Sequence, residues 1–442
     1  MRGLFAVIAI SVTCQVTHAQ SCPPRWAGLA VNATVRTLEA GPGGTLYVGG
    51  DFTSPVPYVA ALSGSALTPV GTGLGGSVLD IMSHDDGFGP RLYVTGFVNV
   101  PGTGQSTVTF ARLNGGLFQA FGLQTGPASW TGHMASYNFG GGPRLVVTSP
   151  TFMIGCDYVG EWNGTNWTCM GAGLGSVIHD SAIYNDGSGP ALYCTGSLVI
   201  NNTPFSDGIG IARWNGSAWT AVGGGLRDGP GNACTVFDSG EGPELVVAGQ
   251  FTRVGPITSW VSARRIARWN GTRWAALGAG VDRTVNAVEP FDDGSGLKLY
   301  VGGEFLEAGG MAVQRIARWD GATWSSCPAG GPVSGVVYDL CVYDPDGEGP
   351  LSSRLGVGGT FSVVGQFAAQ NLAILVAGQS IDFNNDGLFP DTADIQDFLS
   401  VFSGGSCPTG LCGSIDFNGD GIFPDTADID SLLSVFAGGP CF

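Results

Sequence analysis

Short apolar runs alternate with glycine-rich turns along most of the chain, and the same arrangement returns about every 50 residues. In each unit an apolar run leads into an acidic glycine turn, as in HDDGFGP from His84 and YNDGSGP from Tyr184. A second run then reads LYVTG, LYCTG, LVVAG or LYVGG, and a third reads IARW. Short apolar runs bounded by turn residues predict strands rather than helices. We therefore expect four short strands in each unit.

The junction between the third and fourth strands is the clearest part of the repeat. The segments IARWNGSAW, IARWNGTRW and IARWDGATW begin at Ile211, Ile266 and Ile316. Looser copies surround three earlier positions: Leu62, Leu113 and Trp162. The Asn-Gly or Asp-Gly pair in each copy predicts a two-residue hairpin turn, whose central residues need positive φ. Four hairpin-linked strands in a unit of this length are typical of a propeller blade.

The two ends of the repeat region complement each other. The segment RWAGLAVNATV from Arg25 matches RWAALGAGVDRTV from Arg273, so the region begins with the last strand of a unit. The unit that starts near Ser334 ends at NLAILVAG and lacks this strand. Six whole units and one shared unit predict an all-β fold, a seven-bladed β-propeller over residues 20–379 that the N-terminal strand closes. An open β-solenoid is the alternative, but it would not need complementary ends, and closure removes exposed sheet edges.

The recurring LYVGGxF and IARWNGxxW segments resemble extracellular kelch-like or Rax2-like propeller repeats. This resemblance covers residues 22–379. It implies a fold and leaves function open, because propellers include lectins, hydrolases and scaffolds.

The C-terminal part contains two copies of a different unit, IDFNNDGLFPDTAD from Ile381 and IDFNGDGIFPDTAD from Ile415. The pattern D-x-N-x-D-G places oxygen ligands at loop positions 1, 3 and 5 and the turn glycine at position 6, as in an EF-hand loop. An extra residue in LFPD or IFPD delays the closing aspartate by one position. We predict two Ca²⁺ sites, one formed by Asp382, Asn384, Asp386, the Leu388 carbonyl and Asp394. The other is formed by Asp416, Asn418, Asp420, the Ile422 carbonyl and Asp428.

Each loop leads into a predicted amphipathic helix. In the first copy Ile395, Phe398, Leu399 and Phe402 share one face, and the second copy repeats the pattern. We expect these two faces to pack together, and we expect Asp391 and Asp425 to cap the helices rather than to bind metal.

Two such loop-helix copies resemble a dockerin type I module over residues 381–442, and we place the domain at residues 380–442. The resemblance implies calcium-dependent binding to a cohesin-like or cell-surface partner. The shifted closing aspartate and the FPDTAD insert depart from the usual pattern, and they leave the identity of the partner open. The GGxC ends resemble a variant of exported bacterial proteins, of planctomycete type.

The first residues predict export. An apolar run follows Arg2, and small residues precede Ala19, which predicts a signal peptide over residues 1–19. No later apolar stretch is long enough to span a membrane, so we expect a secreted or cell-surface protein. Ten cysteines remain after the leader, a number compatible with disulfides outside the cell. A net charge of −17 with scattered arginines argues against nucleic-acid binding.

Catalytic motifs are not evident in the repeat region. His84, His133 and His179 belong to no HExxH or GxSxG motif, so we interpret them as turn or strand residues. The acidic glycine turns could bind calcium and the paired tryptophans could stack on sugars. Their recurrence at fixed positions instead favours turn structure and packing between blades.

The leading functional hypothesis is a secreted, non-catalytic binding or scaffold protein that its calcium-binding tail attaches to a partner, with a carbohydrate as a candidate ligand of the propeller. The alternative is a polysaccharide-degrading enzyme, or its accessory subunit, with its active site in the propeller channel. Two or three clustered carboxylates in that channel would favour the enzyme, and a channel of glycine, alanine and backbone would exclude it. A third hypothesis makes the tail a sorting signal and the propeller a passive repeat.

Overall fold

The computed structural model describes most of the repeat region and both C-terminal helices. The described residues are 24–64, 66–98, 108–121, 133–148, 156, 158–200, 209–328, 333–345, 352–378, 392–405, 417 and 425–436. The predicted signal peptide lies outside them. The chain divides into two compact units, one built mainly from Pro23–Gly378 and the other containing the C-terminal helices. None of the described helices has the length and apolarity needed to cross a membrane.

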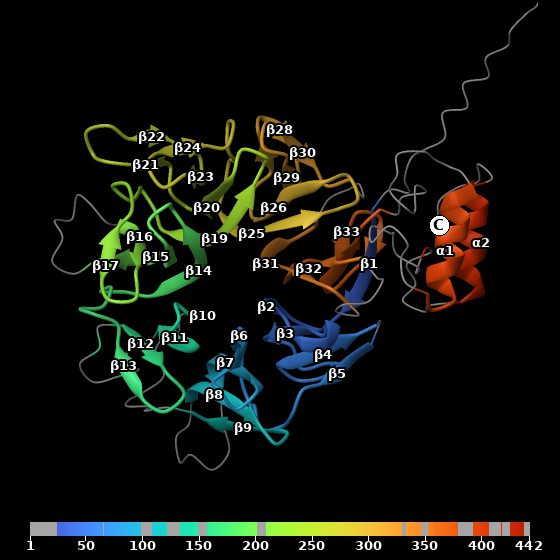
Figure 1. The fold of residues 1–442 in the computed structure, drawn as a ribbon, viewed down its shortest axis with the longest axis horizontal. Coiled ribbons are helices and arrows are strands. Elements are labelled where there is room, and N and C mark those ends of the chain that lie inside the picture. The colour runs from blue at the N-terminus through green and yellow to red at the C-terminus, as the bar shows by residue number, and fades with distance from the viewer. Residues whose placement is uncertain are drawn as a thin grey trace, which may run out of the picture. The chain divides into compact units, whose positions relative to one another are not determined.

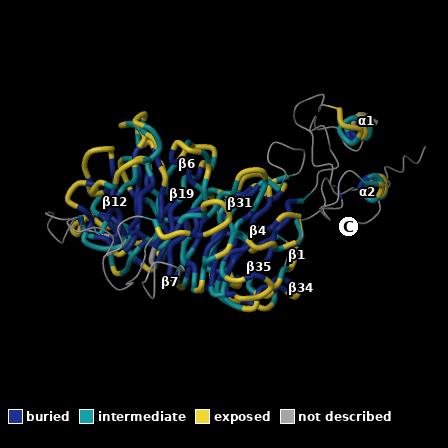
Figure 2. The backbone as a smooth tube through the Cα atoms, turned by 90° about the horizontal axis from the view of Figure 1, so that it is seen from below, coloured by how far each residue is buried: buried dark blue, intermediate teal, exposed yellow. Residues whose placement is uncertain are grey.

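The repeat region is a β-propeller with four-stranded blades, as the repeat predicted. Its described residues form seven four-stranded sheets, and the strands within each sheet are antiparallel. Figure 1 shows these sheets arranged around a common centre, which is the arrangement of propeller blades. Buried residues follow the strands and exposed residues lie mostly at the turns (Figure 2). We number the blades in chain order.

Blade 1 contains β2 (Val35–Ala40), β3 (Leu46–Gly50), β4 (Val59–Ser63) and β5 (Ala66–Pro69), with a short 3-10 helix at Pro42–Gly44. Blade 2 contains β6 (Val78–Asp85), β7 (Pro90–Val98), β8 (Val108–Asn114) and β9 (Leu117–Ala120). Blade 3 contains β10 (Met134–Tyr137), β11 (Arg144–Thr148), β12 (Val159–Trp162) and β13 (Trp167–Cys169). Blade 4 contains β14 (Ile178–Asn185), β15 (Pro190–Val199), β16 (Ile209–Trp214) and β17 (Trp219–Ala221).

Blade 5 contains β19 (Gly231–Asp238), β20 (Pro243–Gly249), β23 (Ile266–Trp269) and β24 (Trp274–Ala276). Blade 6 contains β25 (Val285–Asp292), β26 (Leu297–Gly303), β29 (Ile316–Trp319) and β30 (Trp324–Ser326). Blade 7 contains β31 (Val336–Tyr343), β32 (Arg354–Thr360), β35 (Asn371–Val376) and β1 (Arg25–Ala30).

Short extra strands connect the second and third strands of the last three blades. In blade 5 these are β21 (Arg253–Val254) and β22 (Val261–Ser262), which extend a small sheet with β18 (Leu226–Arg227). In blade 6 they are β27 (Glu307–Ala308) and β28 (Met311–Ala312). In blade 7 they are β33 (Val363–Val364) and β34 (Phe367–Ala368).

The N-terminal strand belongs to the same sheet as the last three strands of the repeat region. Strand β1 pairs with β35 from Arg25 opposite Val376 to Ala30 opposite Asn371. Trp26 is 4% exposed and lies in a core cluster shared with residues of blades 6 and 7. The complementary ends of the repeat therefore meet in blade 7, where β1 covers the edge that β35 would otherwise expose.

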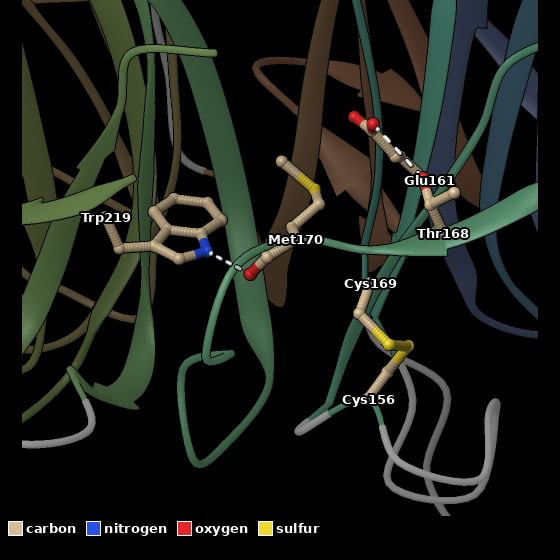
Figure 3. The surroundings of a disulfide bond; sticks show 6 residues. All are labelled: Cys156, Glu161, Thr168, Cys169, Met170 and Trp219. Carbon is tan, nitrogen blue, oxygen red and sulfur yellow. Dashed lines mark hydrogen bonds between the residues drawn. A yellow bond between two sulfur atoms is a disulfide. The ribbon is translucent and has the colours of Figure 1, made fainter. Parts of the chain in front are cut away.

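The paired tryptophans pack between neighbouring blades, as expected from their fixed positions. Trp219 of blade 4 donates its indole N–H to the Met170 carbonyl of blade 3, at 2.9 Å (Figure 3). Trp324 of blade 6 does the same to the Leu277 carbonyl of blade 5, at 2.9 Å. Both indoles are almost fully buried. Sugar stacking on these tryptophans is excluded by their burial.

The Asn-Gly turns differ from the expected two-residue hairpins. Trp214 is paired with Trp219, so four residues connect β16 and β17. The Asn215 side chain accepts the backbone N–H groups of Ser217 and Ala218, and only Gly216 has a positive φ, of 95°. The asparagine therefore caps a longer turn with its side chain.

One disulfide is present among the described residues. Cys156 is bonded to Cys169, which ends strand β13 of blade 3 (Figure 3). Within the described part of the chain, Cys194, Cys234, Cys327 and Cys341 are reduced. An even number of cysteines therefore does not mean that the cysteines of the blades are all paired in disulfides.

The C-terminal unit contains helices α1 (Thr392–Phe402) and α2 (Thr426–Phe436). Phe398 is fully buried and packs edge-on against Phe417, which lies at position 2 of the second predicted calcium loop. Leu399 and its counterpart Leu433 are each 43% exposed. The prediction that these leucines lie on the packed face is therefore wrong, because the buried face is narrower than the apolar stripe.

Candidate functional site

A local irregularity in the innermost strands determines which residues line the centre of the propeller. In six blades the pairing between the first and second strands skips one residue of the first strand. In blade 2 this register shift lies between Val78 and Asp80. Such a bulge re-aims the side chain that follows it. The central cavity has a volume of about 520 Å³. The residues after the shift, with His133 before β10, line it: Thr37, Asp80, His133, Asp180, Ala233, Ala287 and Asp339.

We call these seven residues the channel ring. Its three aspartates connect neighbouring blades. The Asp80 carboxylate accepts the N–H of Met134 in blade 3 at 2.6 Å. Asp180 of blade 4 accepts the N–H of Cys234 in blade 5 at 2.7 Å. Asp339 likewise connects blade 7 to blade 1. The other oxygen of each aspartate accepts the N–H of the residue that follows it in its own strand.

His133 lies between two of these carboxylates. Its Nδ1 is 3.2 Å from Asp80, its Nε2 is 3.7 Å from Asp180, and Nε2 is also 3.0 Å from the Ser181 hydroxyl. Burial alone would lower the pKa of His133, but the charges of Asp80 and Asp180 outweigh burial and raise the pKa to about 9. The imidazolium form therefore prevails at neutral pH, and it links blades 2, 3 and 4 through charge-assisted contacts.

A second layer of the channel holds two glutamates. Burial raises the pKa of Glu39 and of Glu289 to about 7 in each case. Glu39 accepts the N–H of Ser83 in blade 2 at 2.9 Å, and Glu289 faces the N–H of Val342 in blade 7. Burial also raises the pKa of the thiol of Cys341, which lies in the strand between these two glutamates. The channel is thus acidic and polar, and its carboxyl groups are engaged with backbone donors of the next blade.

Reading the sequence motif by motif misses the channel residues, although a signal was available. The motifs indicate His133 only as a strand or turn residue, and they single out no aspartate of the ring. The residue seven positions before the turn glycine faces the channel in blades 2, 3 and 4. Aligning the units at that glycine would have shown Asp80, His133 and Asp180 at one position. Only the bulge next to this position reveals that it points inward.

The acidic glycine turns stabilise the blades, as the repeat suggested. In blade 6, Asp293 is 1% exposed and accepts the Tyr300 hydroxyl at 2.5 Å. The same carboxylate pairs with Arg318 of the IARW strand. Blades 2 and 4 repeat this Tyr-Asp-Arg contact through Asp86 and Asp186. These carboxylates hold three strands of one blade together.

We expect that Tyr300→Phe lowers the free energy of unfolding by about 1–3 kcal/mol, because it leaves a buried carboxylate with one fewer donor. Urea unfolding followed by circular dichroism measures this loss. Tyr47→Phe is the matched control, since Tyr47 has the same place in blade 1 but its turn reads Gly-Pro-Gly-Gly. Equal effects of the two substitutions would contradict the role of the Asp293 contact.

Comparison with known proteins finds similarity to solved structures at low sequence identity. No protein family matches the chain, and no curated protein matches it. Among solved structures, YCF48 bound to a D1 peptide is 11% identical, with a TM-score of 0.46, over 80% of this chain and 97% of that chain. The WD40 β-propeller domain of Doa1 is 11% identical, with a TM-score of 0.46, over 81% of this chain and 97% of the other. BBS1N in complex with ARL6DN is 9% identical, with a TM-score of 0.48, over 81% and 97%.

Two of the ten predicted calcium ligands lie in described residues. Asp394 and Asp428 occupy the first turns of α1 and α2, and both are 0% exposed. The other eight lie outside the described residues: Asp382, Asn384, Asp386, Leu388, Asp416, Asn418, Asp420 and Ile422. In the part of the chain that the structure describes, no three His, Cys, Asp or Glu side chains are grouped to hold a metal.

The start of α2 shows how the closing aspartate is positioned. Asp425 accepts the N–H groups of Ala427 and Asp428, at 2.8 and 3.3 Å, and so acts as the predicted cap. The Asp428 carboxylate in turn accepts the N–H of Asp425 at 3.2 Å. This reciprocal arrangement is a capping box, which directs Asp428 back toward the loop before the helix.

Proposed function

We propose that this chain is a secreted, non-catalytic binding or scaffold protein, whose dockerin-like tail binds two Ca²⁺ ions and attaches it to a protein partner or to the cell surface. In this proposal a closed, seven-bladed propeller over residues 20–379 displays the binding surface. The leader, residues 1–19, directs export, and the module at residues 380–442 provides attachment.

The observation that carries the proposal is the burial of Asp394 and Asp428 at equivalent places in two helices. A buried carboxylate is costly unless a cation or several donors compensate it. The N-terminal turn of a helix supplies N–H groups and a partial positive charge, which favour a carboxylate at this place. A Ca²⁺ ion held by the preceding D-x-N-x-D-G loop would place a cation beside each of these carboxylates, since Ca²⁺ prefers carboxylate and carbonyl oxygens.

The channel supports a structural role for its carboxylates. Each aspartate of the channel ring accepts two backbone N–H groups, one from its own strand and one from the next blade. Carboxylates held in this way stabilise the assembly of the blades.

Calcium titration of the full-length protein tests the proposal. We expect isothermal titration calorimetry to show two sites in the wild type, and about 100-fold weaker binding at each site whose closing aspartate is changed by Asp394→Asn or Asp428→Asn. Asp397→Asn and Asp430→Asn are the matched controls, because these residues lie farther along the same helices. Calcium binding that is unchanged in the double variant would refute the assignment.

A second candidate, a polysaccharide-degrading enzyme, is favoured by the carboxyl groups that line the channel together, as the sequence-based criterion requires. Glu39 and Glu289 have pKa values near 7, which suits a general acid. Release of reducing sugar from polysaccharides by the full-length protein, abolished by Glu39→Gln or Glu289→Gln, would support this candidate. Absence of release leaves the binding protein as the proposal.

A further inference from the structure

A surface groove lies between blades 4 and 5, where one loop is longer than its counterparts in blades 6 and 7. Its volume is about 510 Å³. Its floor comes from blade 4 through Gly196, Ser197 and Gly210, and its wall comes from the small sheet of β18, β21 and β22. A cavity of this size suits a small ligand or a short piece of a polymer.

The wall of the groove is a departure from the repeat. In blade 6 two residues, 309–310, connect β27 to β28, and in blade 7 residues 365–366 connect β33 to β34. In blade 5 the corresponding connection between β21 and β22 is six residues long, 255–260. This longer loop contributes Ile257 and Trp260, which are 62% and 46% exposed, to the lining of the groove.

Trp260 is held in place although it is exposed. The Arg253 guanidinium lies over its ring, 4.9 Å from the centroid. Asp228 fixes that guanidinium through two hydrogen bonds, at 2.5 and 2.8 Å. The base of the loop is anchored as well, since Arg227 donates to the Gly255 carbonyl at 2.8 Å. An aromatic ring positioned in advance loses little entropy when a ligand binds to it.

The chemistry of the groove favours an uncharged, flat ligand with many hydroxyl groups. A pyranose ring offers an apolar C–H face to an indole and hydroxyl groups to neighbouring polar side chains. Arg253 and Asp228 largely neutralise each other, so the pair offers hydrogen-bonding edges without a strong net charge. Arg227, the second arginine of the lining, donates to the backbone carbonyls of Gly224 and Gly255. The chain has a net charge of −17, which repels anionic polymers.

We propose that this groove is a binding site for neutral polysaccharide, with Trp260 as the stacking surface and the Arg253–Asp228 pair as the hydrogen-bonding edge. This inference names the ligand that the proposed binding protein displays the propeller to capture, and it therefore rests on the proposed function. It is independent of the channel and of the calcium-binding tail, because every residue of the groove lies in blades 4 and 5 or in the segment that joins them.

The test is a titration of the full-length protein with oligosaccharides, in which binding is measured by calorimetry and by tryptophan fluorescence. The probes are hexasaccharides of β-1,4-glucose, β-1,4-xylose, β-1,4-mannose and β-1,3-glucose, with hexagalacturonate and decaproline as an anionic and a peptide probe. We expect at least one neutral hexasaccharide to bind, and Trp260→Ala to weaken its binding at least about ten-fold. Trp260→Phe should retain most of the affinity, because it keeps an aromatic face.

The matched control is Phe367→Ala, which removes an exposed aromatic side chain from the corresponding hairpin of blade 7. It should leave saccharide binding unchanged. The proposal is overturned if no neutral hexasaccharide binds, if Trp260→Ala binds as well as the wild type, or if only hexagalacturonate or decaproline binds. Each titration is run in calcium and in chelator. Saccharide binding should be the same in both, so a failure of the calcium proposal is distinguishable from a failure of this one.

Discussion

Replacing Trp26 by alanine is expected to lower the free energy of unfolding by about 3–5 kcal/mol, the usual cost of removing a large buried aromatic side chain. Trp26 is 4% exposed and contacts the core shared by blades 6 and 7. The strand that carries it, β1, is separated from its partner β35 by almost the whole propeller sequence. Weakening β1 therefore loosens the contact that joins the two ends of the propeller, and it exposes β35 as a sheet edge.

Urea unfolding followed by circular dichroism measures this effect. Ala27→Ser, at an exposed position of the same strand, is the control and should change the free energy of unfolding by less than about 0.5 kcal/mol. Limited proteolysis gives a second measure, because a propeller opened at blade 7 should be cleaved faster than the wild type. A loss below about 1 kcal/mol for Trp26→Ala would mean that β1 contributes little to the folded state.

Raising the pH from 5 to 9 is expected to destabilise the propeller, because the raised pKa values of His133, Glu39 and Glu289 all act in this direction and outweigh the lowered pKa of His179. The pKa of His133 is raised to about 9 in the folded protein. Its contribution is complete below the unfolded pKa of about 6.5 and is lost as the pH rises through the folded value. A difference of this size corresponds to about 3 kcal/mol. Glu39 and Glu289 have pKa values of about 7 in the folded protein. Their contribution to the free energy of unfolding is complete below about pH 4.5 and is lost as the pH rises through about 7.

The pH profile separates these groups. Thermal unfolding at intervals between pH 4.5 and 9.5 should show a falling midpoint in the wild type. Glu39→Gln and Glu289→Gln should flatten the profile between pH 4.5 and 7, because the variants no longer ionise there. His133→Gln should flatten it between pH 6.5 and 9, and should be destabilised at pH 6 because Asp80 and Asp180 lose their cation. A wild-type midpoint that rises from pH 5 to pH 9 would contradict the electrostatics of the channel.

The channel explains why a propeller can contain so many carboxylates at its centre. In the three blades whose bulge carries an aspartate, glycine or alanine would remove the acceptor of two backbone N–H groups, at a cost of about 1–3 kcal/mol each. An aspartate at this position accepts one N–H from its own strand and another from the next blade, as Asp180 does. The same residues therefore satisfy the backbone and fix the angle between blades. A catalytic role would require one of them to exchange these contacts for a substrate.

The blades could be predicted from the amino-acid sequence. Strand positions, turn positions and the complementary ends depend on local patterns of apolar and turn residues, and each pattern recurs at a fixed spacing that can be read without a structure. The pairing of β1 with β35 followed from comparing Arg25 with Arg273 in the sequence. The capping role of Asp425 followed from its place before a periodic apolar run.

The residues that line the channel and the groove could not be predicted in this way, because their places depend on how the blades pack. His133 meets Asp80 and Asp180 because bulges in neighbouring blades aim side chains about 50 residues apart at one point, and no local pattern encodes that direction. Trp260 becomes an exposed, fixed aromatic surface because a loop of six residues replaces the tight turn of its sister blades. Side-chain direction and burial arise from the packing of one blade on another, and that packing exists only after the blades have assembled.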